Sequence, residues 1–215
     1  EEGNYIRSYF GEPANVMVAG NFPNKIPLLP TQEKSTGSLK LISIGLISPM
    51  KNILMVLQAL EPIAFSIEYD IYGSVKDEEY WDLCKEQIKK LPANITTTFH
   101  NEIEPPKVKD ALAEAHVFIL PSKSENFGHA IFEALSAGRP VITSNNTPWN
   151  HLKESDAGRN VSIENNSELT DAIAFFAAMN QEEMEKWSVA AHHYSEEALD
   201  LEKIKEEYKE MFVFS

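Results

Sequence analysis

The chain has 215 residues, of which 43% are hydrophobic and 24% charged, and this is enough apolar sequence to build the core of one ordinary globular domain. Its 33 acidic and 19 basic side chains give a formal net charge of −14, so we expect no binding to nucleic acid. No apolar run approaches the roughly 20 residues of a transmembrane helix and no signal peptide is visible, which favours a cytoplasmic protein.

The first 38 residues differ in pattern from the rest of the chain. Residues 1–10 can form a short helix and Asn15–Ala19 a short strand, whereas residues 20–38 are punctuated by prolines and are typical of a linker. Because Glu1 lies in what resembles the middle of a helix, we expect the chain to be a fragment of a longer protein.

From residue 39 onward, short apolar strands alternate with helices, and the stripe from Ile53 to Leu60 has the spacing of one helix face. Strands that are apolar throughout are buried on both faces, so the sequence predicts an α/β fold with a parallel sheet covered by helices. We expect strands at Leu39–Ile44, Ile67–Tyr72, Ile95–Phe99, Val117–Leu120, Pro140–Thr143 and near Asn160–Ile163. We expect helices near 53–60, 77–90, 108–115, 129–137, 167–179, 182–194 and 197–212.

The segment after the fourth predicted strand carries two glutamates separated by seven residues. Glu125 precedes the helix and Glu133 lies within it, while Gly128 permits a close approach of the backbone at the helix start. Amides at the start of a helix favour an anion such as a diphosphate. A carboxylate at Glu133 could accept two hydrogen bonds from a ribose diol.

The string Glu-Asn-Phe-Gly-His-Ala-Ile-Phe-Glu-Ala-Leu-Ser-Ala-Gly-Arg-Pro-Val-Ile, which starts at Glu125, resembles the Glu-x7-Glu region of the group 1 retaining glycosyltransferases of the GT-B fold. The similarity to the C-terminal, donor-binding domain of that family runs from about residue 39 to residue 180. It implies a Rossmann-like domain over 39–215, with C-terminal helices, and makes 1–38 the end of an N-terminal domain and the interdomain linker.

The resemblance assigns roles to the residues of this string. It implies that Glu125 contacts the donor sugar beside the reacting carbon and is the catalytic candidate, and that Glu133 holds the ribose. It places the neighbouring donor-binding groups at Asn126, Phe127, Gly128, His129 and Ala130.

The loop after the first strand resembles the family pattern Gly-Arg-x4-Lys, whose two cations hold the diphosphate. Lys51 matches the lysine, and a flexible ammonium suits a phosphate. Leu46 stands where the family has arginine, so one cation is missing and weakened donor binding or loss of activity is an open alternative.

Two further loops follow the second and third strands. Gly73 would let the backbone approach a ligand, and Glu102 and Ile103 lie where the family places the nucleotide base. We expect Trp149 to brace its loop rather than to contact the ligand.

Cysteine and histidine placement argues against a metal site. Cys84 shares a helix face with Trp81 and Ile88 and is expected in the core, and the pair His192 and His193 is expected on a helix surface. The six histidines lack metal-site spacing, and no Asp-x-Asp pair occurs that would bridge a metal to a diphosphate. We therefore expect no metal and no other cofactor.

The resemblance implies a hexosyltransferase that moves a sugar, with retention, from a UDP-, GDP- or ADP-sugar to a saccharide or lipid-linked acceptor, as in polysaccharide biosynthesis. The N-terminal acceptor domain would be missing, so we expect this fragment to bind donor without transfer. The missing domain could hold the whole protein at the inner face of a membrane. The alternatives are a GT-B epimerase or hydrolase, and a nucleotide-sugar-binding module without catalysis.

Overall fold

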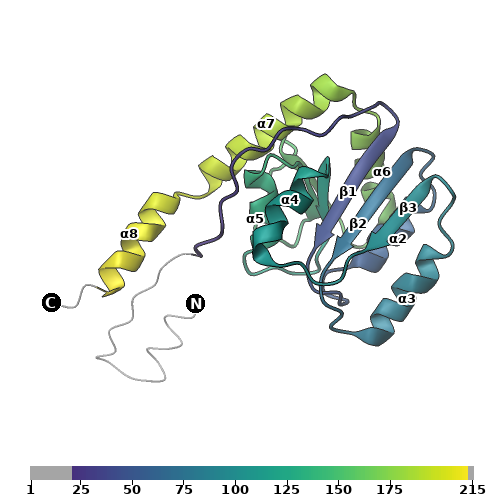
Figure 1. Cartoon of the computed structure of the whole chain (residues 1–215), viewed down its shortest axis with the longest axis horizontal. Coiled ribbons are helices and arrows are strands. Elements are labelled where there is room, and N and C mark those ends of the chain that lie inside the picture. Colours follow the sequence, from purple (N-terminus) through teal and green to yellow (C-terminus); the bar gives the residue numbers. More distant parts are fainter. Residues whose placement is uncertain (1–20, 213–215) are drawn as a thin grey trace.

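The computed structural model describes residues 21–212 (Figure 1). The expected helix at 1–10 and strand at Asn15–Ala19 lie outside the described residues. The described part forms a six-stranded parallel sheet in the order β3-β2-β1-β4-β5-β6. The strands are β1 Ser38–Ile44, β2 Ser66–Tyr72, β3 Ile95–Phe99, β4 Val117–Leu120, β5 Val141–Ser144 and β6 Gly158–Val161.

Helices cover the sheet on both sides. On one side α2 packs against α3 and α6, and elsewhere α5 packs against α7, while α8 extends away from the body of the domain (Figure 1). The helices are α2 Ile53–Leu60, α3 Glu78–Ile88, α4 Val108–Ala113, α5 His129–Ser136, α6 Asn166–Ala177, α7 Gln181–Ala198 and α8 Leu201–Phe212, and a 3₁₀ turn η1 spans Pro105–Lys107. The predicted alternation of apolar strands and helices is confirmed.

Several predicted boundaries differ by one or two residues, and two of the differences have a visible structural reason. The sixth strand begins two residues earlier than expected, at Gly158, where a Cβ atom would lie 1.9 Å from the Val141 carbonyl oxygen. The last two helices separate at Leu199, whose backbone is extended, and not before residue 197. α7 continues through Ser195 because this side chain is buried and its hydroxyl donates to the carbonyl of His192.

The single cysteine and the paired histidines can now be placed. Cys84 is fully buried, as predicted, and burial raises the pKa of its thiol to about 11. His193 is exposed, but the expectation for His192 is wrong, because its ring is largely buried with Nδ1 2.6 Å from the Ser136 carbonyl oxygen. α7 therefore uses His192 to pack on the end of α5.

Residues 21–37, which we call the strap, are held against the domain by buried basic side chains. Lys34 is 4% exposed, and its ammonium donates to the carbonyls of Ala177 and Met179 at 3.1 and 2.7 Å, at the end of α6. Arg139 is fully buried and donates to Pro30 and Leu112 carbonyls, both at 2.7 Å. The segment expected to be a linker is thus packed onto the sheet domain from residue 26 onward.

His116 gives this packing a dependence on pH. Its ring is 2% exposed, Nδ1 accepts the Lys40 amide at 2.9 Å, and Nε2 lies 3.1 Å from the Glu33 carbonyl oxygen of the strap. Burial is the main cause that lowers the pKa of His116 to about 4. The neutral ring is therefore the form that fits the folded chain.

We expect acid to destabilise the domain through this histidine. The unfolded chain takes up a proton near pH 6.5 and the folded chain near pH 4, so the stability contributed by neutral His116 is complete above pH 6.5 and is lost as the pH falls toward 4. Between pH 7 and pH 5 this linkage is worth about 2 kcal/mol. Urea unfolding at both pH values measures it. In His116→Gln most of the difference in unfolding free energy between the two pH values should disappear. In His193→Gln, the control at an exposed position, the difference should stay the same.

Candidate functional site

The loops that follow β1 and β4 meet at the carboxyl edge of the sheet, because these strands are neighbours in parallel register. The amide of Lys123 donates to the Met50 carbonyl at 2.8 Å, and the Asn52 side chain donates to the Pro121 carbonyl at 3.3 Å. Between the loops and the start of α5 lies a cavity of about 730 Å³. It is lined by Asn21, Ile44–Leu46, Met50, Lys51, Leu120 and Ser124–Ala130.

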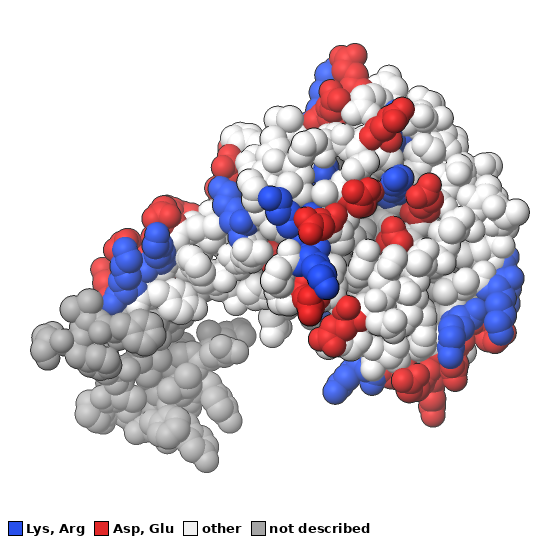
Figure 2. Space-filling model, in the orientation of Figure 1, with Lys and Arg blue, Asp and Glu red and all other residues white. Residues whose placement is uncertain are grey.

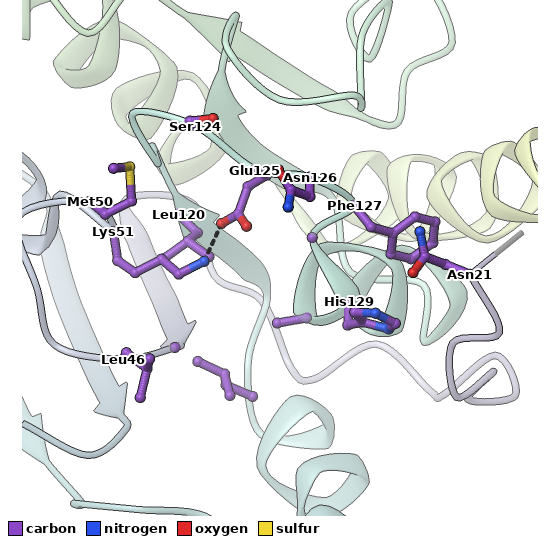
Figure 3. A pocket seen from close by; sticks show the side chains of 14 residues that line it. Asn21, Leu46, Met50, Lys51, Leu120, Ser124, Glu125, Asn126, Phe127 and His129 are labelled. Atoms are coloured by element: carbon purple, nitrogen blue, oxygen red, sulfur yellow. Dashed lines mark hydrogen bonds and ion pairs between the residues drawn. The ribbon is translucent and has the colours of Figure 1, made fainter. Parts of the chain in front are cut away.

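Lys51 and Glu125 point toward one another across this cavity (Figure 3). The ammonium nitrogen of Lys51 lies 2.5 Å from Oε1 of Glu125, and the two side chains are 22% and 9% exposed. The hydroxyl of Ser122 donates to the same oxygen at 2.7 Å. The two side chains that the sequence marked for the diphosphate and the sugar therefore form one ion pair.

The start of α5 forms another wall of the cavity. Gly128 has φ 82°, a left-handed conformation in which a Cβ would lie 3.1 Å from both Ile131 Cδ1 and the indole nitrogen of Trp149. The same indole nitrogen donates to the Phe127 carbonyl at 2.5 Å, so the expected bracing role of Trp149 is confirmed. Amides in the first turn of a helix have no acceptor within the helix, and those at His129 and Ala130 are available to an anion.

Leu46 and Met50 bring apolar surface to the side of the cavity where Lys51 enters. Each is 49% exposed, and Figure 3 shows Leu46 beside Lys51 and away from His129. Among the residues that line the described cavity, Lys51 is the one lysine or arginine. Because Lys51 is paired with Glu125, the two side chains together carry no net charge.

Glu133 lies one turn into α5 and is not part of the lining of this cavity. Its carboxyl is half-buried, and burial raises its pKa while a hydrogen bond from Asn24 of the strap lowers it. Of the two glutamates of the sequence motif, Glu125 therefore lines this cavity and Glu133 does not.

A second cavity of about 660 Å³ lies at the ends of β2 and β3. Tyr72 and His100 stack within it, with ring centroids 4.3 Å apart and planes 8° apart, and Nε2 of His100 is 2.6 Å from the Asp70 carboxylate. Glu102 and Ile103 also line it. Ile44, which lines the first cavity, and Tyr72, which lines the second, are register partners on adjacent strands, so both cavities lie at the same edge of the sheet.

Gly73 joins these two regions. Its amide donates to the Asn101 carbonyl at 2.7 Å, and a Cβ atom would lie 1.8 Å from the Gly45 carbonyl oxygen. The glycine is therefore required for the loops to approach one another. Contact of Gly73 with a ligand stays a prediction.

Ser122, Tyr72 and His100 lie at the two cavities but are not among the site residues predicted from the sequence. His100 follows β3 directly and Ser122 follows β4 after Pro121, so their places at the strand ends are visible in the sequence. The register that stacks Tyr72 on His100 becomes visible only in the structure.

Comparison with known proteins gives a family for this site. The family model described as glycosyl transferases group 1 matches residues 27–194, which include the motif from Glu125 to Glu133 and every residue that lines the two cavities except Asn21. The chain belongs to this family. The model begins inside the strap, which agrees with the packing of these residues on the domain.

Individual proteins match this chain at low sequence identity or over a short stretch. The chain is 33% identical over 60 residues to the sulfoquinovosyl transferase SQD2 of Arabidopsis thaliana, which is 28% of this chain and 12% of that protein. A TarM variant of S. aureus, solved with UDP among its ligands, matches with a TM-score of 0.75 and 16% identity over 98% of this chain and 42% of its own. HepE of Anabaena, solved with UDP and glucose, matches with a TM-score of 0.67 and 16% identity over 81% of this chain and 48% of its own.

The chain thus spans less than half the length of these solved relatives, and its fold is one Rossmann-like half of a GT-B glycosyltransferase. Within residues 21–212 no helix is both long and apolar enough to cross a membrane. On the face shown in Figure 2, acidic and basic side chains alternate rather than gather by sign.

Proposed function

We propose that this chain binds the nucleotide-sugar donor of a retaining hexosyltransferase, with the donor sugar and diphosphate in the first cavity. The observation that carries the proposal is the ion pair between Lys51 and Glu125, 2.5 Å long, beside the free amides that begin α5. A cation and a row of amides suit the diphosphate, and a carboxylate suits the hydroxyls of the sugar.

Breaking the anomeric bond releases negative charge on the diphosphate and leaves positive charge on the sugar ring. Lys51 has three N–H donors, of which one is held by Glu125, so two remain for diphosphate oxygens. The helix start adds amides aimed at the same charge. Glu125, fixed beside them, can orient the sugar hydroxyls near the reacting carbon. In this proposal no metal ion is needed for the leaving group.

The nucleoside would extend from the first cavity to the second. The base would lie by Ile103 and Glu102, near the stacked rings of Tyr72 and His100. Glu133 would accept the ribose hydroxyls, since its half-buried carboxylate lies on α5, the helix whose start borders the first cavity. UDP-, GDP- and ADP-sugars all remain candidate donors.

Transfer itself would need the other half of the GT-B fold. In the proposed enzyme that half supplies the saccharide or lipid-linked acceptor and closes the sugar away from water, which are large parts of the rate acceleration. We therefore expect the 215-residue chain to bind donor and to transfer nothing. A glycosyl-transfer assay that compares this chain with the full-length protein tests this, and equal turnover would refute it.

A second candidate is a nucleotide-sugar-binding module without catalysis, favoured by the half-exposed Leu46 on the phosphate side of the cavity. An epimerase or hydrolase acting on the same donors is the alternative within enzymes. Donor consumption by the full-length protein, followed with and without acceptor, separates the three. Loss of donor only with acceptor supports transfer, loss without acceptor supports the epimerase or hydrolase, and no loss supports the module.

Nucleotide binding should depend on Glu133. Glu133→Ala removes a half-buried acceptor of the ribose hydroxyls, so we expect the affinity for a nucleoside diphosphate to fall by about 1–3 kcal/mol. Calorimetry with UDP, GDP and ADP measures the change. Glu185→Ala, on the exposed face of α7, is the matched control and should leave the affinity unaltered. Unchanged binding in Glu133→Ala would leave its carboxylate as part of the strap contact alone.

A further inference from the structure

Ser122 is a buried hydroxyl at the edge of the candidate site, immediately after β4 and Pro121. Its side chain is fully shielded from solvent, and its backbone is fixed from two directions. The Ser122 amide donates to the Leu120 carbonyl at 2.9 Å, and its carbonyl accepts the hydroxyl of Ser144 on β5 at 2.5 Å. The position of Ser122 is therefore set by the sheet and not by the loop around it.

The hydroxyl of Ser122 and the ammonium of Lys51 converge on one oxygen of Glu125. The distances to Oε1 are 2.7 Å from Ser122 and 2.5 Å from Lys51. With both donors on Oε1, Oε2 is the oxygen left for a ligand in the cavity that Glu125 lines. A carboxylate held by two donors on one side presents its other side in a defined direction.

The two donors differ in how firmly they can hold Glu125. Lys51 carries its ammonium on a flexible four-carbon stem, and in the proposed function the same ammonium serves the diphosphate. The lysine therefore divides its donors between two anions. Ser122 is neutral, short and anchored on β4 and β5, so it can hold Glu125 while Lys51 moves toward the diphosphate.

We infer that Ser122 is a positioning residue, which acts through Glu125 to orient this carboxylate toward the donor sugar. The expected effect on sugar binding rests on the proposed function, because there the donor sugar is the group that Glu125 contacts. A purely structural role for the Ser122 hydroxyl, as a local bond within the loop, would instead affect all ligands of the cavity alike.

The test uses Ser122→Ala with Thr143→Val as its matched control. Thr143 is equally buried, lies on β5, and donates its hydroxyl to the Leu120 carbonyl at 2.8 Å without contact to Glu125. Calorimetry on the 215-residue chain compares the affinity for UDP with that for UDP-glucose, and the affinity for GDP with that for GDP-mannose. In Ser122→Ala we expect nucleoside diphosphate affinity to stay within about two-fold and the nucleotide-sugar to bind roughly five-fold more weakly. Thr143→Val should keep the wild-type ratio of the two affinities.

Crystal structures of both variants without ligand make the test independent of nucleotide binding. In Ser122→Ala we expect the Glu125 carboxylate to move away from Lys51 or to occupy several rotamers. In Thr143→Val we expect it to stay in its wild-type position. An unmoved Glu125 in Ser122→Ala overturns the inference, as does an equal loss of diphosphate and nucleotide-sugar binding. Wild-type chain that binds no nucleotide would refute the proposed function, and the crystal structures would still decide the role of Ser122.

Discussion

Replacing Gly73 with alanine should destabilise the folded chain by more than about 3 kcal/mol, the sum of a backbone and a packing cost. Gly73 has φ 150°, which L side chains rarely adopt. Its added Cβ would lie 1.8 Å from the Gly45 carbonyl oxygen and 2.7 Å from the Gly45 carbonyl carbon. These atoms belong to the backbone directly after β1 and cannot move aside as a side chain could.

The displacement would reach the proposed site. Gly45 begins the loop that carries Leu46 and Lys51, and its amide donates to the Tyr72 carbonyl at 3.0 Å. Forcing Gly73 and Gly45 apart would separate the end of β2 from that loop. The two cavities, which adjoin at this point, would change together.

Urea unfolding measures the free energy of unfolding of Gly73→Ala and of its control, Gly45→Ala. A Cβ on Gly45 would meet only side-chain carbons of Leu120 and Lys51 at 3.8 Å, which is ordinary contact. We expect Gly45→Ala to cost less than about 1 kcal/mol. Similar stabilities for the two variants would contradict the close approach of these loops.

The sequence predicted the sheet well because the central strands β1, β4 and β5 are largely buried on both faces and the helices carry apolar stripes. The edge strand β3 is different, since three of its five residues are threonine. The sequence did not predict the start of the edge strand β6 at Gly158, because glycine is not typical of a strand. It also did not predict the end of α7 at Leu199, because the helical spacing of apolar residues continues past this break. Local pattern alone holds no information about which backbone packs against Gly158.

The site was predicted unevenly for a related reason. Motif spacing marked Glu125, Lys51 and Gly128, because each stands at a strand end or helix start. The pairing of Lys51 with Glu125 joins residues 74 positions apart and needs the β1–β4 neighbourhood of the sheet. The strap has the composition of a linker, and its packing cannot be predicted from the sequence because the basic side chains that hold it, such as Arg139, are polar and become buried only in the fold.

Removing the ammonium of Lys51 should weaken diphosphate binding much more than nucleoside binding. A hydrogen bond to a charged group contributes about 1.5–3 kcal/mol, so Lys51→Ala should lower the affinity for UDP or GDP by roughly 10- to 100-fold. It also leaves the 9%-exposed Glu125 without its cation, and the bare carboxylate would repel a diphosphate further. Uridine and guanosine carry no phosphate and should bind nearly as before. Lys123→Ala, an exposed lysine of the neighbouring loop outside the cavity lining, is the control and should change neither ligand.

The complementary change, Leu46→Arg, should tighten the diphosphate selectively. Leu46 is 49% exposed and lines the cavity beside Lys51, so a guanidinium there would meet the phosphate side without entering the core. Its planar fork can bind two oxygens at once, and it would add net charge to a site where Lys51 is neutralised by Glu125. We expect at least about a ten-fold gain for UDP or GDP in calorimetry and none for the nucleoside. Met50→Arg, equally exposed on the same loop, tests whether the position or merely the charge matters. Equal gains for nucleoside and diphosphate would show that the loop does not face the phosphates. In the full-length protein, a Leu46→Arg variant that acquires transfer while the wild type has none would identify the natural chain as a binding module.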